Sequence, residues 1–483
     1  MLLTVLRMAQ TCRLGVQQKA GNPAIMGHAG RWRPPQDPMA APHSLTTAPI
    51  LPTLWRLSVP NMFAMGATAL VSVAETVYVG LLGTPALAGM ALVFPLIMLQ
   101  QMLSAGSIGG GISAAVSRAI GAGQQARADA LALHAVIISA VLGLFFSALV
   151  LLWGRPLFEL VGGQGAALEQ SLAYAQIAFA GALSIWLANA LASVIRGAGN
   201  MKTPSLTLLG VAVGQIVLGG LLGLGWGPVP RLGMAGIALG QVIAFSLGTL
   251  YLYHHLRTGQ GRVRLVFSIR LLQRQHFHDI LKVGAVASIS SLQTVLTILI
   301  VTRIVAGYGT EALAGYGIGA RLEFLLIPVT FAIGVACLPL VGMALGSGLV
   351  ARARRVAWTG ASLAAAIVGG IGLLVAVFPD AWSRLFTEQP LVIAYAGSYF
   401  RWVAPAYGFF AFGLCLYFAA QGAGKLLGPV LAGTLRLLLV AVGGWLLVHY
   451  DVPVEGMFAL ISAAMLLYGL VTALTVYYVR WGD

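Results

Sequence analysis

The sequence predicts an all-α polytopic membrane protein with twelve transmembrane helices in two parallel six-helix lobes, and three observations lead to this fold class. Only 8% of the 483 residues are charged and 59% are hydrophobic, whereas a soluble globular chain carries roughly a quarter charged residues. Twelve apolar runs follow one another along the chain, and short motifs of its first half recur in the second. This composition argues against soluble enzymes, nucleic-acid-binding modules and disordered scaffolds.

The apolar runs are long enough to cross a bilayer, which takes roughly 20 residues of helix. The strands of a membrane barrel would alternate in polarity over about ten residues, whereas these runs are uniformly apolar, so they are predicted to be helices. The runs lie at about 55–79, 87–117, 129–153, 168–195, 203–226, 232–256, 280–306, 313–343, 354–378, 393–421, 427–448 and 456–480.

Charged residues alternate between the connections of these runs. Every second connection is basic, as around Arg127, Lys202, the stretch 257–274, Arg352 and Lys425, and the others are acidic or nearly neutral. Cytoplasmic connections of membrane proteins carry the excess of Lys and Arg. We therefore expect a protein of the cytoplasmic (inner) membrane with both termini in the cytoplasm. The net charge of +15 then indicates topology and no nucleic-acid partner.

Residues 1–53 do not belong to this pattern. They contain several arginines and, from Pro34 onward, six prolines, but no apolar core long enough for a secretory signal. Two interpretations stay open. The segment is either a disordered tail or an extension that precedes a true start at Met26 or Met39.

The sequence lacks the motifs of metal sites and of nucleotide hydrolysis. The three cysteines, Cys12, Cys337 and Cys415, lie far apart, and the eight histidines show no spacing typical of metal ligands. No glycine-rich phosphate loop is present. We therefore expect no metal, no cofactor and no catalytic residues, and the chain is not expected to be an enzyme.

Three glycine-bearing motifs recur at a spacing of 225 or 226 residues. They are Gly83–Gly89 with Gly309–Gly315, Gly121–Gly123 with Gly346–Gly348, and Arg196–Gly199 with Gln421–Gly424. The repeat divides the chain into an N-lobe at 54–256, a cytoplasmic linker at 257–279 and a C-lobe at 280–483. Parallel halves with a substrate cavity between them are a known transporter plan, so transport is the leading hypothesis.

Ionisable side chains inside a membrane are costly and mark candidate functional sites. Glu75 lies on the first helix, and Asn61, Thr68 and Ser72 share its face at helical spacing. Removal from water favours the protonated form of a carboxyl group, so Glu75 is a candidate for exchanging a proton or binding a small cation. The alternative is a glutamate at the membrane interface without such a role.

The second half offers candidates for lining a substrate cavity. They are Gln293, Thr297, Tyr316, Arg321 and Glu323. For Glu323 a salt bridge between helices is an equal alternative, and for the polar face of helix seven the alternative is hydrogen bonding between helices. The remaining mid-span cation, Arg436, is expected to be structural.

Motifs of residues 54–480 resemble a known family. They are the first-helix ending Glu75–Gly83, which is similar to an acid-Thr-x-x-Val-Gly-x-x-Gly pattern, then Arg196–Asn200 with Thr203-Pro204, and Gly121–Gly123. This combination resembles the multidrug and toxic compound extrusion (MATE) family. The resemblance implies a cation-coupled antiporter with two six-helix lobes and an alternately exposed cavity, which exports organic compounds that are often cationic.

The resemblance also implies roles for single positions. The coupling aspartate of the family's first helix falls on Glu75. The DinF-like branch, to which the chain is closer, places Asn and Asp four residues apart on helix five, and here Gln215 and Gly219 stand there. The acids that NorM-like members carry on helices seven and ten are also absent. With one acid left, the proton is favoured over sodium as coupling ion, because sodium usually takes several oxygen ligands.

The predicted function is a cation-coupled (H+ or Na+) antiporter that exports small organic, drug-like compounds across the cytoplasmic membrane by alternating access. Glu75 is the predicted coupling residue, supported by Asn61, Thr68, Ser72 and Gln215. The expected partners are a small-molecule substrate and the lipid bilayer, and the expected state is a monomer. Two alternatives stay open: a lipid-linked oligosaccharide flippase of the same broad superfamily, and a membrane scaffold that does not transport.

Overall fold

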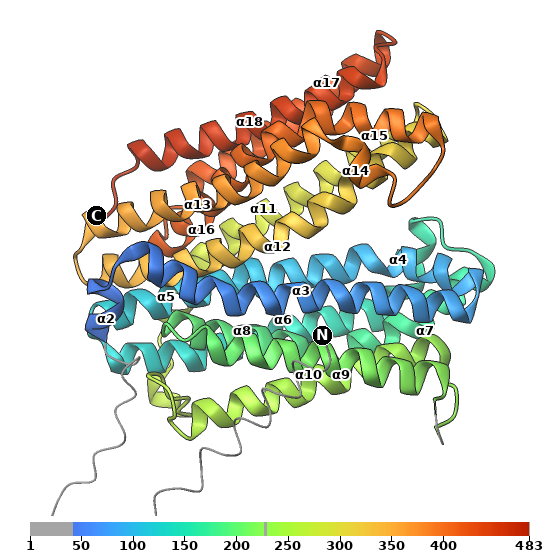
Figure 1. Cartoon of the computed structure of the whole chain (residues 1–483). Helices are drawn as coiled ribbons and strands as arrows, with labels where there is room; N and C mark the ends of the chain where they lie inside the picture. Colours follow the sequence, from blue (N-terminus) through green and yellow to red (C-terminus); the bar gives the residue numbers. More distant parts are fainter. Residues whose placement is uncertain (1–41, 227–228, 483) are drawn as a thin grey trace, which may run out of the picture. The chain divides into compact units, whose positions relative to one another are not determined.

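The protein is seen here as a computed structural model, which describes residues 42–226 and 229–482. The described residues form helices and connections, with no strand among them. Eleven helical segments are long and apolar enough to cross a membrane, and a bent pair of helices that turns by 48° completes a twelfth span. The all-α fold with twelve predicted spans is therefore confirmed (Figure 1).

The first lobe holds spans one to six. Its helices are α3 (Ile50–Leu82), α4 (Thr84–Gln101) continued by η1 (Met102–Ile108) and α5 (Gly109–Gly121), α6 (Gln125–Leu160), the bent pair α7 (Gly165–Ala180) and α8 (Ala182–Gly197), α9 (Lys202–Leu224) and α10 (Gly233–Arg257).

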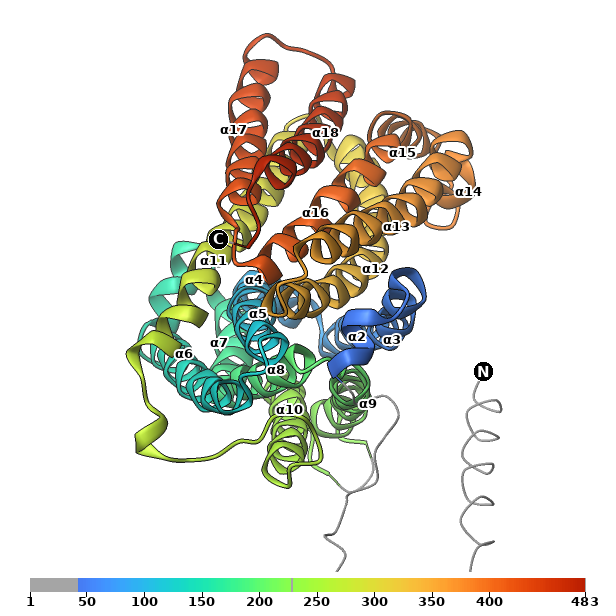
Figure 2. The ribbon, with the colours of Figure 1, turned by 90° about the vertical axis from the view of Figure 1, so that its left-hand side faces the viewer.

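The second lobe repeats this order. Its helices are α11 (Arg274–Ala306), α12 (Thr310–Gly346), α13 (Val350–Val377), the short α14 (Pro379–Ser383), α15 (Pro390–Val403) continued by η3 (Ala404–Ala406) and α16 (Tyr407–Ala423), α17 (Leu427–His449) and α18 (Val454–Tyr478). Viewed along the spans, α3 to α10 and α11 to α18 form two groups of helices that meet at α5, α11 and α12 (Figure 2).

Two predicted boundaries are wrong. Residues 42–53 were assigned to the tail, but a short helix, α2 (Pro42–Thr47), precedes α3, which begins at Ile50. The Nη2 atom of Arg352 donates to the carbonyl oxygens of Leu45 and Ala48, at 3.1 and 2.5 Å, and so ties this segment to the C-lobe. The hydropathy of the sequence does not predict hydrogen bonds between distant segments, so it could not place this boundary. The remainder of the predicted tail, residues 1–41, lies outside the described residues.

The linker is also shorter than the predicted 257–279. Span six ends at Arg257 and α11 already begins at Arg274, with the short helix η2 (Ile269–Leu271) between them. The first turns of α11 are polar, so the apolar pattern misses them. Asp279 of these turns pairs with Arg127 of the N-lobe at 2.7 Å.

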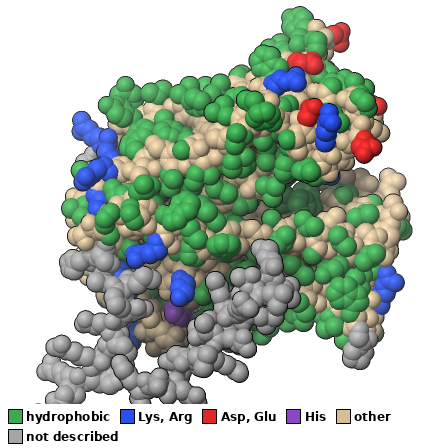
Figure 3. All heavy atoms as spheres, in the orientation of Figure 1, with side chains coloured by type: hydrophobic (Ala, Val, Ile, Leu, Met, Phe, Trp, Pro, Cys, Tyr) green, Lys and Arg blue, Asp and Glu red, His purple; other side chains and the backbone are tan. Residues whose placement is uncertain are grey.

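The spans have one basic and one acidic end. The basic end carries the connections 122–124, 198–201, 258–273, 347–349 and 424–426. The acidic end carries Glu159, Glu169, Glu311, Asp380, Glu388, Asp451 and Glu455. In the space-filling view most Lys and Arg side chains lie opposite the acidic side chains (Figure 3). Of the described acidic residues, only Glu75 and Glu323 lie well inside the spans.

The lobes cross near the basic end through two glycines at equivalent repeat positions. A Cβ atom on Gly121 would overlap the backbone of Met343, and a Cβ on Gly346 would overlap the backbone of Arg118. Since the members of each contact are exchanged by the repeat, α5 and α12 cross on a pseudo-twofold axis. The Ser347 hydroxyl adds a hydrogen bond of 2.8 Å to the carbonyl oxygen of Gly121.

Further polar contacts join the lobes from the basic end to the middle of the spans. They are the Arg127–Asp279 ion pair, the bond from Arg118 to the Gly422 carbonyl oxygen (3.0 Å), the bond from Gln421 to the Gly106 carbonyl oxygen (3.1 Å) and the Ser107–Ser291 hydroxyl pair (2.8 Å). Among the described residues no hydrogen bond or ion pair joins the lobes in the half nearer the acidic end. There the surface is hollowed between the lobes (Figure 3).

We predict that Gly346→Ala destabilises the protein, because the new methyl group meets backbone atoms of the other lobe that cannot rotate away. Overpacking of this kind costs roughly 1–3 kcal/mol. The matched control is Gly370→Ala in the middle of α13, where a Cβ meets nothing within 4 Å and better helix propensity stabilises by up to about 1 kcal/mol. Thermal unfolding in detergent compares them. Equal midpoints for Gly346→Ala and wild type would show that the crossing is not tight.

Candidate coupling and substrate site

Glu75 and Gln215 meet between two helices of the N-lobe. Their helices, α3 and α9, pack along each other, and the Nε2 atom of Gln215 donates to Oε1 of Glu75 at 2.8 Å. Gln215 is buried and Glu75 is half-buried. One turn further along α3 the Tyr78 hydroxyl donates to the Ile216 carbonyl oxygen at 3.2 Å. The pair of residues that the sequence could associate only through the family resemblance is thus in direct contact.

Among the described residues the other predicted supports make no hydrogen bond to Glu75. Asn61 is buried near the opposite half of α3, and its Nδ2 atom has no hydrogen-bond partner among the described residues. Thr68 and Ser72 are exposed, and the Thr68 hydroxyl bonds to the Ala64 carbonyl oxygen of its own helix at 3.1 Å. The predicted polar face is therefore real as a pattern on α3, but only Gln215 completes the site around the carboxyl group.

A second acid is missing beside Glu75. The position four residues after Gln215 is Gly219, and a Cβ atom built there would lie 3.9 Å from the ring of Tyr78. An aromatic ring thus borders the place where a carboxylate would stand. Among the described residues no three His, Cys, Asp or Glu side chains are grouped as metal ligands. One carboxyl group with one amide suits a proton better than a bare metal ion, which prefers several oxygen ligands.

The amide of Gln215 can serve both protonation states of Glu75. Its NH2 group donates to a carboxylate, and its carbonyl oxygen can accept a hydrogen bond from a carboxylic acid after the amide turns over. The site therefore remains hydrogen-bonded whether Glu75 carries a proton or not, which avoids the penalty for an unpaired polar group in the interior.

A second polar cluster lies deeper in the N-lobe, and sequence reasoning missed it. The Nδ2 atom of Asn189 donates to Gln101 at 3.2 Å and to Ser104 at 2.9 Å, and the Tyr174 hydroxyl donates to Gln241 at 3.1 Å. A cavity of ≈ 10 Å³ borders Gln101 and Gln241, which is about the space of one water molecule. These residues come from three spans, so spacing on a single helix gave no signal for them.

Of the predicted cavity residues in the C-lobe, Gln293 instead joins two helices, and Thr297 bonds within its own helix. The Nε2 atom of Gln293 donates to the Thr434 hydroxyl at 2.8 Å, and the Thr297 hydroxyl bonds to the Gln293 carbonyl oxygen at 2.7 Å. Gln293 and Thr434 thus link α11 to α17, which pack against each other. This arrangement favours the alternative of hydrogen bonding between helices for the polar face of α11.

The remaining three candidates separate into two groups. Glu323 accepts a hydrogen bond from the Tyr399 hydroxyl, and the Tyr316 and Tyr399 rings meet edge to face at 5.7 Å. Arg321 is exposed, and its guanidinium lies 5.0 Å from the ring centre of Phe386. No ion pair of Glu323 is present among the described residues. Tyr399 is a partner that the sequence did not indicate, because it lies on a different span.

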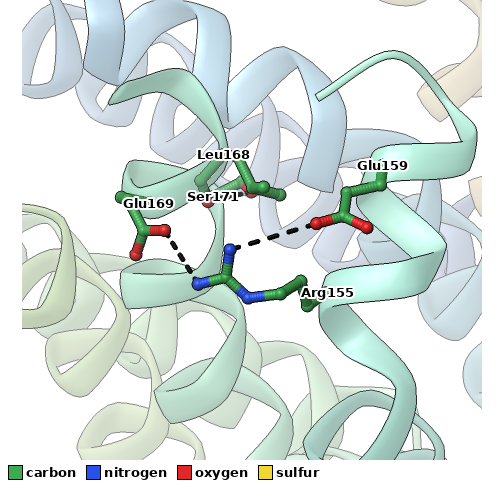
Figure 4. A network of polar contacts seen from close by, with 5 residues as sticks. All are labelled: Arg155, Glu159, Leu168, Glu169 and Ser171. Carbon is green, nitrogen blue, oxygen red and sulfur yellow. Dashed lines mark hydrogen bonds and ion pairs between the residues drawn. The ribbon is translucent and has the colours of Figure 1, made fainter. Parts of the chain in front are cut away.

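A cavity of ≈ 290 Å³ lies elsewhere, between α6 and α7 near the acidic end. Arg155 lines it and pairs with Glu169 at 2.8 Å and with Glu159 at 4.0 Å (Figure 4). Both partners are more than half exposed, and exposed pairs contribute little to stability. This cluster is separate from Glu75 and from the C-lobe candidates.

Comparisons with known proteins agree with this architecture. The MatE family model matches residues 60–221 and 287–446, one segment in each lobe. A FAD transporter of Shewanella oneidensis is 25% identical over 379 residues, which cover 78% of this chain and 83% of that protein. A probable multidrug resistance protein NorM of Thermotoga maritima is 24% identical over 385 residues, which cover 78% of this chain and 81% of that protein.

A solved structure gives the same result for the fold. It is described as the outward-facing conformation of a multidrug resistance MATE family transporter of the MOP superfamily, and it matches with a TM-score of 0.82 at 25% identity. The match covers 90% of this chain and 96% of that chain. The predicted MATE resemblance is confirmed, while its DinF-like branch stays a prediction. The chain belongs to the MatE family, and it is a multi-pass membrane transporter and not an enzyme.

Proposed function

We propose that the protein is a proton-coupled antiporter that exports small organic compounds. The observation that carries the proposal is the contact of Glu75 with Gln215 inside the N-lobe. Glu75 is a single titratable group on α3, and Gln215 on the neighbouring α9 is a hydrogen-bond partner for each of its protonation states. Intramembrane carboxyl groups of this kind mark ion and proton pathways.

Coupling requires that the proton and the substrate favour different states of the same group. An ionised Glu75 attracts a cationic compound, and a protonated Glu75 does not. Proton uptake therefore releases a cationic substrate, and substrate binding releases the proton. Glu75 needs no further acid for this exchange.

The contacts between the lobes fit a transporter state that is closed at the basic end and open at the acidic end. They join the basic end and leave the half nearer the acidic end unjoined among the described residues. We propose that the basic end faces the cytoplasm, since cytoplasmic connections are enriched in Lys and Arg. In that orientation both described ends of the chain are cytoplasmic, and the protein is open toward the outside as a monomer in the cytoplasmic membrane.

The relatives support two substrate classes. Multidrug relatives such as the Thermotoga protein support drug-like compounds. The relative described as a FAD transporter supports a second candidate, a flavin nucleotide, which is an anion. A basic group in the middle of the C-lobe, Arg436, favours this second candidate. The flippase alternative stays a prediction, whereas a scaffold without transport does not fit these relatives.

We predict that Glu75→Gln abolishes transport driven by a pH gradient. The amide keeps the shape of the side chain and its bond to Gln215 but holds no exchangeable proton. In proteoliposomes with ethidium as probe, uphill transport should fall by on the order of tenfold or more, while downhill movement continues and no longer responds to pH. The control is Glu388→Gln, an exposed glutamate at the acidic end. Uphill transport by Glu75→Gln at the wild-type rate would contradict proton coupling at this residue.

We also predict that Gln215→Leu impairs coupling more than folding. Leucine cannot form the hydrogen bond that the Glu75 carboxyl group accepts from Gln215. The relative free energies of the protonated and the ionised Glu75 should therefore change. The pH profile of ethidium transport should change, and the thermal midpoint should stay close to that of the control Val217→Leu, an exposed position on the same helix. An unchanged pH profile would show that Gln215 plays no part in proton exchange.

A further inference from the structure

Arg436 lies inside the C-lobe, in the middle part of α17. Its Cζ atom is 5.0 Å from the ring centre of Phe410 on α16 and 5.8 Å from that of Tyr468 on α18. The two rings are themselves 5.5 Å apart. The guanidinium group therefore lies against both rings, on the same side of the pair, in a cation–π contact with each.

The Arg436 guanidinium has no anion beside it. No carboxylate of the described residues lies within 4.0 Å of it, and it donates no hydrogen bond to a described residue. Glu323 interacts with it only through charge at longer range, since the Glu323 carboxyl group is bonded to Tyr399. A structural arginine would be expected to have a partner at this depth.

The unpaired group is chemically well defined. Aromatic rings contact the face of a guanidinium, whereas its N–H donors point outward in its plane and match the two oxygens of a carboxylate or phosphate. Arg436 is half-buried, so part of its side chain remains accessible. Its five N–H donors can bind an anion, and no described residue provides an acceptor for them.

We propose that Arg436, packed against Phe410 and Tyr468, is a substrate subsite for an anionic group, a carboxylate or a phosphate, on a compound that also carries an aromatic ring. This role replaces the structural one expected from the sequence. It rests on the proposed transport function and deepens it, because it names the substrate class for the C-lobe while Glu75 supplies coupling in the N-lobe.

The test uses two ligands that share one ring system and differ in a phosphate group. Riboflavin and riboflavin 5′-phosphate are titrated against the purified full chain, with fluorescence as readout. Wild type should prefer the phosphate ester by on the order of tenfold. Arg436→Gln should lose this preference, and Arg436→Lys should keep part of it, because an ammonium group retains the charge but not the fork. The control Arg303→Gln, an exposed arginine of the same lobe, should behave as wild type.

Several outcomes would overturn the subsite. They are no preference in wild type, the same preference in Arg436→Gln, and an equal loss for both ligands in Arg436→Gln, which would indicate a structural role. The titrations are repeated in vesicles of phosphatidylcholine with and without phosphatidylglycerol. Competition by the anionic lipid that depends on Arg436 would identify a lipid phosphate as occupant in place of a soluble anion, and so overturn the substrate assignment.

The two proposals fail in different ways. Binding is measured without a gradient, so it reports on Arg436 even if no transport occurs. In proteoliposomes Glu75→Gln should lose uphill transport of ethidium, the cation that exchanges with the proton, whereas Arg436→Gln should lose transport of riboflavin 5′-phosphate and keep that of ethidium. Loss of ethidium transport in Arg436→Gln would contradict a role confined to anions.

Discussion

The close crossing of α5 and α12 is the constraint on which the arrangement of the two lobes depends. Glycines at equivalent repeat positions, Gly121 and Gly346, let each helix touch the backbone of the other. A crossing on a pseudo-twofold axis can act as a pivot, because rotation about it changes the separation of both ends of the lobes while the contact itself persists. The polar contacts of Arg118 and Gln421 then hold the basic end closed.

The fold could be predicted because its repeated motifs coincide with helix crossings. Gly89 packs on the backbone of span four, and Gly315 packs on span ten in the same way. Gly83 and Gly309, which begin these motifs, both have φ of 110°, a conformation that favours glycine. The site was only partly predictable. Partners such as Tyr399 and Thr434 lie on other spans, and which side chains meet depends on helix rotation, which spacing along one helix does not determine.

The two lobes share a backbone plan but differ in their polar groups. The repeat places Val301 and Val440 where the N-lobe has Glu75 and Gln215, and both valines are buried. The C-lobe carries Glu323 with Tyr399, and an unpaired Arg436. This asymmetry fits a division in which Glu75 exchanges a proton for a cation in one lobe and Arg436 binds an anionic group in the other. Both tasks then act on the one equilibrium between the two ends of the spans.

The central claim is that protonation of Glu75 shifts the protein between states that are open at opposite ends. Pulsed electron spin resonance between labels at Leu160 and Leu385, two exposed residues of different lobes at the acidic end, measures this directly once the native cysteines are replaced. The account predicts two distance populations whose ratio changes with pH in the wild type and does not change in Glu75→Gln. A ratio that changes with pH equally in both proteins would contradict it.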